Sequence, residues 1–328
     1  MQVEGKMVLI YILIIFLVIS IIISFGIGSN DETMATLYGS KTVSMKELLI
    51  LATIFAILGA FLLGNAVSET IGKDLLSFSV SNAIVFTILI STAIWLILSS
   101  ALGLPISTTH ATIGAIIGVG LLLGGGLGIN WLTILEMSLW WLLSPVIGYI
   151  ATYLTYKLVH KFIINKLSGF KSFVRTEKYF SYILLGAICW TAFSRAGNDC
   201  SNAVGIVVGV GTGIDIHLLL LFTGLSFASG ILVLGRGVIK NVGTITELHP
   251  STAFASEIPA AIILFFGTIL GIPLSGSHML VASLVGLAKA RRAPTKKGLW
   301  KIVMIWLLTF PMAAILSVII YFPINYFI

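Results

Sequence analysis

The chain has 328 residues, of which 58% are hydrophobic and only 9% are charged, and its mean hydropathy is +1.10. Soluble domains carry roughly 25% charged residues, so this composition excludes a soluble globular protein and predicts an integral membrane protein. The formal net charge is +7. We do not expect nucleic acid as a partner, because the basic residues are grouped beside apolar stretches. The expected partner of this surface is the lipid bilayer.

Several continuous apolar stretches are long enough to cross the hydrocarbon core as helices. They are 7–25, 48–63, 83–100, 137–156, 217–234, 254–270 and 299–322. Their continuity argues against a transmembrane β-barrel, whose strands alternate in polarity. The first stretch has no small-residue cleavage signature and leads directly into a polar motif. We therefore expect it to be a retained transmembrane helix rather than a removed signal peptide.

Two polar motifs recur at one offset of 168 residues. Asn30-Asp31 is repeated as Asn198-Asp199, and the segment 103–110 (GLPISTTH) is repeated at 271–278 (GIPLSGSH). Paired Gly/Pro-broken segments in two halves of an apolar chain are typical of secondary transporters, with the site between inverted repeats. We expect an all-α membrane protein with repeat 1 over 1–156, a basic linker over 157–178 and repeat 2 over 179–328, with broken or re-entrant helical segments at the midplane.

The basic residues indicate the orientation of the repeats. They form two groups of six: Lys157, Lys161, Lys166, Lys171, Arg175 and Lys178, and then Lys289, Arg291, Arg292, Lys296, Lys297 and Lys301. By the positive-inside rule both groups face the cytoplasm. The counterpart of the second group in the first half, residues 121–133, has no charge. Equivalent loops with such different charge are expected on opposite membrane faces, which predicts inverted repeats.

The Asn-Asp motifs are candidates for a cation site. A carboxylate at membrane depth costs about 2.5–3.5 kcal/mol or more, so it is a functional candidate by default. Glycine beside Asn-Asp favours a helix break, and the freed carbonyls with the Asp and Asn oxygens would suit an alkali cation. The alternative is an ordinary turn at the membrane surface. The repetition of the motif favours the functional interpretation.

The Gly-Pro-Ser segments are candidates for an anion site. Pro suits the first turn of a helix, so the hydroxyl residues after it would lie at a helix N-terminus, where free amides and the positive end of the dipole bind anions. The alternative is simple N-capping by Ser or Thr. His110 and His278 close the two segments. Each is interpreted either as a proton-sensitive ligand or as a residue that fixes the loop by hydrogen bonds.

In these motifs the chain resembles the inorganic phosphate transporter (PiT) family, whose two repeats each carry a G-x-N-D-x-x-N-A-like signature and a G-x-P-x-S-x-T-H segment. The resemblance covers nearly the whole chain. It implies cation-coupled phosphate uptake across the cytoplasmic membrane. Carried over by position, it implies cation ligands at Asp31, Asp199, Asn30 and Asn198, with Glu257 added as a candidate. It implies phosphate contacts at Ser107, Thr108, Thr109, Ser275, Gly276, Ser277, Asn30, Asn198, Ser201 and Asn202.

The chain departs from the family pattern at three positions. In the first signature Met34 replaces the expected Asn and Glu32 adds a carboxyl group, while Arg195 lies close to a position that is often His. Arg195 could contact the anion, or pair with Glu32 or Asp199. Because some relatives carry sulfate, the altered first signature leaves sulfate and other tetrahedral oxyanions open. Glu257 is interpreted either as a proton site or as the interfacial end of its helix.

A symporter explains the sequence better than two other classes. A passive channel would need polar stripes along whole helices, and an intramembrane enzyme would need a nucleophile with a positioned base or a metal site. The chain has no GxxxxGK[ST] loop to indicate ATP as driver. We expect no enzymatic activity, no cofactor, and sodium rather than a proton as coupling ion. Whether the chain forms a homodimer is left open by the sequence.

Overall fold

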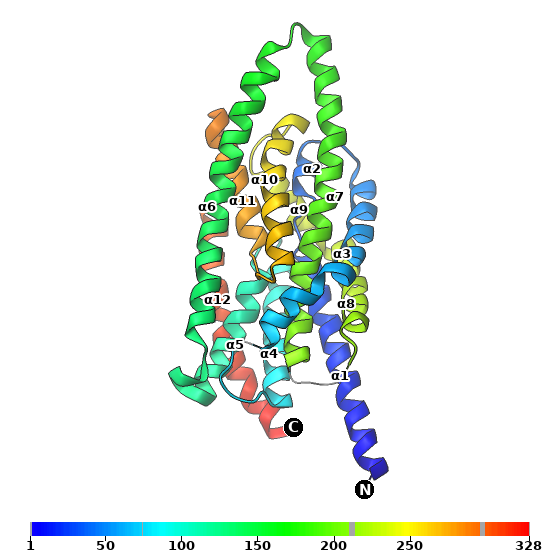
Figure 1. Cartoon of the computed structure of the whole chain (residues 1–328), viewed down its shortest axis with the longest axis vertical. Coiled ribbons are helices and arrows are strands. Elements are labelled where there is room, and N and C mark those ends of the chain that lie inside the picture. Colours follow the sequence, from blue (N-terminus) through cyan, green and yellow to red (C-terminus); the bar gives the residue numbers. More distant parts are fainter. Residues whose placement is uncertain (1, 74, 210–213, 296–298, 328) are drawn as a thin grey trace.

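The computed structural model describes residues 2–73, 75–209, 214–295 and 299–327, and within these residues the fold is built from helices (Figure 1). Their bounds are α1 (Gln2–Ser29), α2 (Ala35–Gly39), α3 (Met45–Lys73), α4 (Asn82–Ala101), α5 (Thr108–Gly124), η1 (Gly125–Gly128), α6 (Trp131–Phe162), η2 (Ile164–Lys166), α7 (Phe170–Gly209), α8 (Ile216–Gly230), η3 (Ile231–Gly235), α9 (Arg236–Gly243), α10 (Pro250–Ile269), α11 (Gly276–Arg291) and α12 (Leu299–Phe327). In the described chain, seven helical stretches are long and apolar enough to cross a membrane. The expected all-α membrane fold is confirmed.

Each expected apolar stretch lies within these helices, with 217–234 covering α8 and η3. The one exception is residue 270, which lies one position beyond the end of α10. The sequence did not predict the length of α7, which runs without interruption for 40 residues. Apolar windows miss this helix because its central turns carry Arg195, Asn198 and Asp199. The short segments expected after each Gly-Pro motif are present as separate helices, α5 and α11.

The basic linker is a helical hairpin rather than a loop. Residues 157–162 continue α6 and residues 170–178 begin α7, so only the turn between them, with η2, is irregular. Figure 1 shows this hairpin projecting beyond the rest of the bundle. Lys296 and Lys297 of the second basic group lie outside the described residues.

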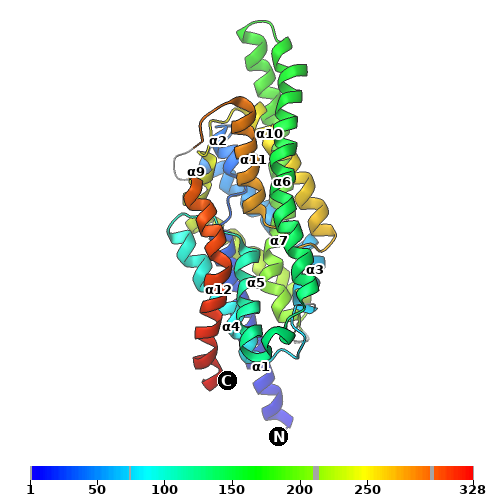
Figure 2. The ribbon, with the colours of Figure 1, turned by 90° about the vertical axis from the view of Figure 1, so that its left-hand side faces the viewer.

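The helix pairs α4–α5 and α10–α11, which are equivalent in the two halves, lie toward opposite ends of the molecule. In both views α4 and α5 lie in the half of the bundle near the chain termini, and α10 and α11 lie in the half near the α6–α7 hairpin (Figures 1 and 2). The uncharged η1 and the basic C-terminal end of α11 are therefore at opposite ends. This arrangement is the one that inverted repeats would produce, and the topology itself stays a prediction to be tested by labelling.

Helices from different halves are in close contact because glycines face them. A Cβ atom added to Gly28 of α1 would lie 1.9 Å from the carbonyl oxygen of Phe227 in α8. A Cβ atom added to Gly59 of α3 would lie 1.9 Å from the carbonyl oxygen of Phe193 in α7. Small residues let transmembrane helices approach each other to backbone contact. The two halves are thereby joined into one body around a central polar cluster.

Candidate ion and anion site

Asn30 holds the loop before α5 by hydrogen bonds from its side-chain amide. Its Nδ2 donates to the carbonyl of Leu104 at 2.8 Å, and its Oδ1 accepts from the backbone N–H of Ile106 at 2.8 Å. The bonded residues lie on either side of Pro105, in a segment that is not helical. Asn30 thereby fixes the position at which α5 begins.

Asn198 makes the same bonds in the second half. Its Nδ2 donates to the carbonyl of Ile272 at 2.9 Å, and its Oδ1 accepts from the N–H of Leu274 at 3.2 Å. Every residue in this set lies 168 positions after its counterpart. The duplication read from the sequence therefore recurs as duplicated geometry. Because both amides are used inside the protein, Asn30 and Asn198 act as positioning residues in this conformation.

The two short helices begin at capped N-termini. Ser107 accepts from the N–H of His110 at 3.2 Å, and Ser275 accepts from the N–H of His278 at 3.4 Å. The expected N-caps are therefore present. The remaining first-turn amides of a helix have no intrahelical partner and carry the positive end of the dipole. Each helix start can therefore attract an anion.

The starts of α5 and α11 meet at the centre of the molecule. Thr109 of α5 donates to the carbonyl of Leu274 at 3.1 Å, and Ser277 of α11 donates to the carbonyl of Ile106 at 2.9 Å. These two bonds are equivalent under the same offset. Two helix N-termini are thus brought together at one place, which concentrates positive potential there.

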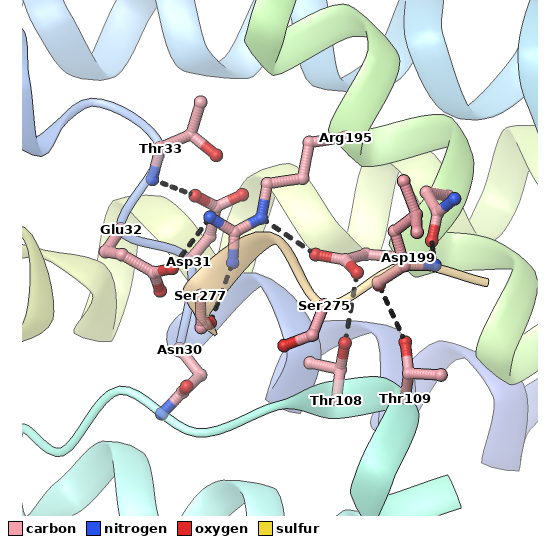
Figure 3. A network of polar contacts seen from close by, with 12 residues as sticks. Asn30, Asp31, Glu32, Thr33, Thr108, Thr109, Arg195, Asp199, Ser275 and Ser277 are labelled. Carbon is pink, nitrogen blue, oxygen red and sulfur yellow. Dashed lines mark hydrogen bonds and ion pairs between the residues drawn. The ribbon is translucent and has the colours of Figure 1, made fainter. Parts of the chain in front are cut away.

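Arg195 lies in the middle of this cluster (Figure 3). Its Nη1 is 2.7 Å from Glu32 Oε1, its Nε donates to Asp199 Oδ2 at 3.0 Å, and its Nη2 donates to Ser277 Oγ at 3.1 Å. A Cβ atom at residue 276 would lie 2.7 Å from Arg195 Nε, so Gly276 is required for the guanidinium to lie against α11. All of these side chains are buried. A buried arginine is tolerable only when it is paired, and here two carboxylates supply the pairing.

The two signature aspartates have different surroundings. Both carboxylate oxygens of Asp199 accept from side chains, one from Arg195 and the other from Thr108 at 3.0 Å. The positions equivalent to those donors in the other half are Ile27 and Gly276, which have no side-chain donor to offer Asp31. In this conformation Asp199 is therefore occupied by protein donors.

Asp31 lies in a more open environment. Its Oδ1 accepts from the N–H of Thr33 at 2.5 Å, and Asp31 and Thr33 line a cavity of about 10 Å³. The Thr33 hydroxyl is buried and has no hydrogen-bond partner among the described residues. A cavity of this volume holds about one water-sized particle. A carboxylate and a free hydroxyl oxygen are suitable ligands for a small hard cation.

The expected helix break is present in one half only. In the first half α1 ends at Ser29, and the N–H of Asp31 bonds to the carbonyl of Gly28 in a turn. In the second half Asn198 and Asp199 lie inside the continuous helix α7. The prediction that Gly-Asn-Asp breaks the helix was therefore wrong for the second half. There Asn198 bonds to the loop, and Asp199 to Arg195 and Thr108, from within the helix.

Three other predicted residues lie near the cluster with different partners. Ser201 donates to the carbonyl of Gly64 at 2.6 Å and to that of Gly197 at 2.6 Å, and thus joins α7 to α3. Asn202 Nδ2 donates to the backbone of Asp199 at 3.1 Å, while its Oδ1 is buried without a partner. Glu257 is wholly buried rather than interfacial.

Glu257 accepts a hydrogen bond from Thr36 at 2.7 Å, and its Oε1 has no partner among the described residues. Sequence reasoning missed Thr33 and Thr36, because nothing distinguishes these threonines from the many others in the chain.

His110 and His278 contact each other rather than the polar cluster. Their ring centroids are 4.6 Å apart, and each ring also contacts a tryptophan, Trp141 or Trp306. Each indole donates to the backbone of the opposite Gly-Pro segment, at Pro273 and Pro105, both at 3.0 Å. The histidines are thus part of an aromatic contact that joins the two halves.

Comparison with known proteins identifies the family. A model of the phosphate transporter family matches residues 25–317, which is most of the chain and includes both halves of the cluster. The chain belongs to the phosphate transporter family. This confirms the resemblance drawn from the motifs. Because the family consists of transporters, it also confirms that the chain is not an enzyme.

The relatives match this family member over most of its length. A protein of Pyrococcus furiosus named "Putative phosphate permease" is 27% identical, over 98% of each chain. The chloroplastic inorganic phosphate transporter 2-1 of Arabidopsis thaliana is 25% identical, over 90% of this chain and 69% of its own. A solved structure described as the sodium-dependent phosphate transporter is 26% identical with a TM-score of 0.88, covering 97% of this chain and all of the other. The fold of this chain is therefore similar to that of this solved transporter.

Proposed function

We propose that this protein is a secondary active symporter that imports inorganic phosphate together with a cation, with sodium favoured over a proton. The observation that carries the proposal is the meeting of two helix N-termini, Arg195 and two buried aspartates at one central point. The family and the relative described as sodium-dependent support the choice of substrate and ion.

The anion side of the proposed site lies at the starts of α5 and α11. Phosphate would take its hydrogen bonds from Ser107, Thr108, Thr109, Ser275 and Ser277, from the free amides of Gly276 and its neighbours, and from Arg195. Charge-assisted bonds to a guanidinium are stronger and more directional than neutral ones. Asn30 and Asn198 support these groups from behind by holding the loops that precede them.

The cation side lies at the aspartates. Asp31 with Thr33 is the position best prepared for sodium, because its oxygens are less fully used and line a small cavity. Asp199 is the second position, and Glu257 is a further buried carboxylate within the same region. Phosphate cannot enter a low-dielectric site alone, because desolvating an anion costs several kcal/mol even after relaxation. Cations bound at the aspartates would offset this cost and couple the two fluxes.

Alternating access is the expected mechanism of movement. In this conformation the polar cluster is buried, and its two halves come from the two repeats. Rocking of one repeat against the other would expose the cluster to each side in turn. We further propose that the repeats are inverted and that the protein resides in the cytoplasmic membrane.

Uptake of radiolabelled phosphate into proteoliposomes tests the proposal. Vesicles with an inward sodium gradient should accumulate phosphate, and vesicles with only an inward proton gradient should accumulate much less. Stronger uptake with the proton gradient would show that a proton, and not sodium, is the coupling ion. Accumulation of sulfate but not phosphate would assign the chain to sulfate, the alternative left open by Met34 and Glu32. Absence of accumulation of either anion with either gradient would refute a symporter.

A further inference from the structure

Glu32 and Arg195 form a buried ion pair that has no equivalent in the other half. The Glu32 side chain is completely buried and Arg195 is 3% exposed, with 2.7 Å between Glu32 Oε1 and Arg195 Nη1. The counterpart of Glu32 is Cys200, and the counterpart of Arg195 is Ile27. The pair is therefore an addition to the duplicated plan, and its two members come from different repeats.

The pair lies at the start of α11, where an anion is expected. The guanidinium is in contact with Gly276, and its Nη2 donates to Ser277. Glu32 thus pairs with a group that the proposed site offers to phosphate. A carboxylate resembles one edge of phosphate in charge and in the spacing of its oxygens, and a guanidinium binds both in the same way.

Glu32 is incompletely satisfied where it lies. Its Oε2 is buried and has no hydrogen-bond donor among the described residues. The Ser277 hydroxyl donates its proton to Ile106, so it is not available to Glu32. Leaving part of a buried carboxylate without a donor is costly, whereas phosphate with its larger number of oxygens could use the same donors more fully. The donors of this site therefore satisfy the oxygens of Glu32 less fully than they could satisfy those of phosphate.

We propose that Glu32 is a tethered substitute for phosphate, which pairs with Arg195 when the transporter is empty and is displaced when phosphate binds. The inference rests on the proposed function. For net uptake, the empty transporter must change back from its inward-facing to its outward-facing conformation after it releases phosphate. Exchange of internal for external phosphate does not require this step. Asp199 pairs with Nε of Arg195, so in the closed empty site it is the Nη1 edge of the guanidinium that would lose its anionic partner without Glu32. A buried guanidinium edge without a partner would oppose that return, and Glu32 supplies the partner.

The test compares net uptake with exchange in proteoliposomes containing E32Q. Net uptake is measured with an inward sodium gradient and no internal phosphate, and exchange with equal sodium and phosphate on both sides and label outside. We expect E32Q to lose most of its net uptake and to keep its exchange. We also expect phosphate to bind purified E32Q more tightly, by roughly tenfold, since the competing charge is gone. E136Q, on the exposed face of α6, is the matched control and should resemble wild type in all three assays.

Further variants separate this role from a merely structural one. E32D keeps the charge on a shorter side chain, so it should recover part of the net uptake and shift phosphate binding in the same direction as E32Q, but less. If E32Q does not insert, the binding shift of E32D alone decides. Parallel loss of uptake and exchange, or unchanged or weaker phosphate binding, would overturn the inference. Failure of wild type in both assays would instead refute the proposed phosphate transport.

Discussion

Asn30 and Asn198, which are 168 residues apart, each bond to the carbonyl before a proline and to the N–H after it. The two asparagines also reach a hydroxyl in the same relative place, Ser100 at 3.1 Å and Thr268 at 3.3 Å. The conserved element between the halves is thus a hydrogen-bonding pattern, which places two helix starts against each other. Among the charged residues within that frame, Asp31 and Asp199 are duplicated, whereas Glu32 and Arg195 are not.

The first prediction concerns the stability provided by these asparagines. Asn30→Ala and Asn198→Ala should each lower the thermal midpoint of the purified protein, because each leaves a buried N–H and a buried carbonyl without a partner. Each unsatisfied group costs about 1–3 kcal/mol. The measurement is thermal unfolding in detergent, with Asn325→Ala as control, since Asn325 is exposed near the end of α12. A midpoint equal to that of the control would contradict the positioning role.

The second prediction concerns the cation site. Asp31→Asn and Asp199→Asn should each abolish gradient-driven phosphate uptake while the protein remains folded and inserted, because the amide cannot neutralise a bound cation. Uptake is compared at equal membrane abundance, with E136Q as control. Normal uptake by both variants would show that neither aspartate is a required cation ligand.

The third prediction concerns selectivity. Protonated phosphate can donate a hydrogen bond, whereas sulfate at neutral pH only accepts. A site that pairs a substrate proton with a carboxylate can discriminate strongly against an analogue lacking that proton. Arsenate, which shares the shape and protonation of phosphate, should therefore compete for uptake, and sulfate at the same concentration should compete weakly. Competition is measured as inhibition of labelled phosphate uptake. Better competition by sulfate than by arsenate would make the substrate assignment wrong.

The fourth prediction concerns Ser107 and Ser275. Ser107→Ala and Ser275→Ala should each weaken phosphate binding by about 1–3 kcal/mol, the cost of leaving a buried partner unsatisfied. Because both residues also cap helices, each variant should in addition lose about 1 kcal/mol of stability. Replacement by Thr keeps the hydroxyl and the cap, and should restore most of both. Equal phosphate binding by the Ala and Thr variants would exclude these hydroxyls from the anion site.

The fifth prediction concerns topology. Single cysteines at Gly126 and Lys289, in a chain whose buried Cys189 and Cys200 have been replaced, should be labelled from opposite sides, with Lys289 cytoplasmic. Gly126 is suitable because a Cβ there meets nothing within 4 Å and its φ is not positive, unlike that of Gly125 at +57°. Both positions are exposed. Labelling of both from one side would exclude inverted repeats.

The sequence by itself determined the membrane fold, the duplication and the family. Apolar length alone specifies a helix in lipid, because every backbone group must be satisfied within the segment. The repeated Asn-Asp and Gly-Pro-Ser motifs similarly indicated the central cluster, because polar side chains at membrane depth cost free energy and are therefore candidates for a functional site. The same reasoning left open whether Arg195 contacts the anion or pairs with Glu32 or Asp199.

The tertiary structure decided what each central residue contacts. It showed that Arg195 pairs with both carboxylates, that Asp199 is occupied while Asp31 lines a small cavity, and that α7 continues through its Asn-Asp motif. The contacts of Glu32 with Arg195 and of Thr108 with Asp199 join residues more than 90 positions apart, which no local pattern encodes. A glycine and asparagine motif can end a helix or remain inside one. Asn30 and Asn198 have the same partners, and the two copies differ at the aspartates: Asp199 accepts from Arg195 and Thr108, whereas Asp31 accepts from the nearby backbone N–H of Thr33.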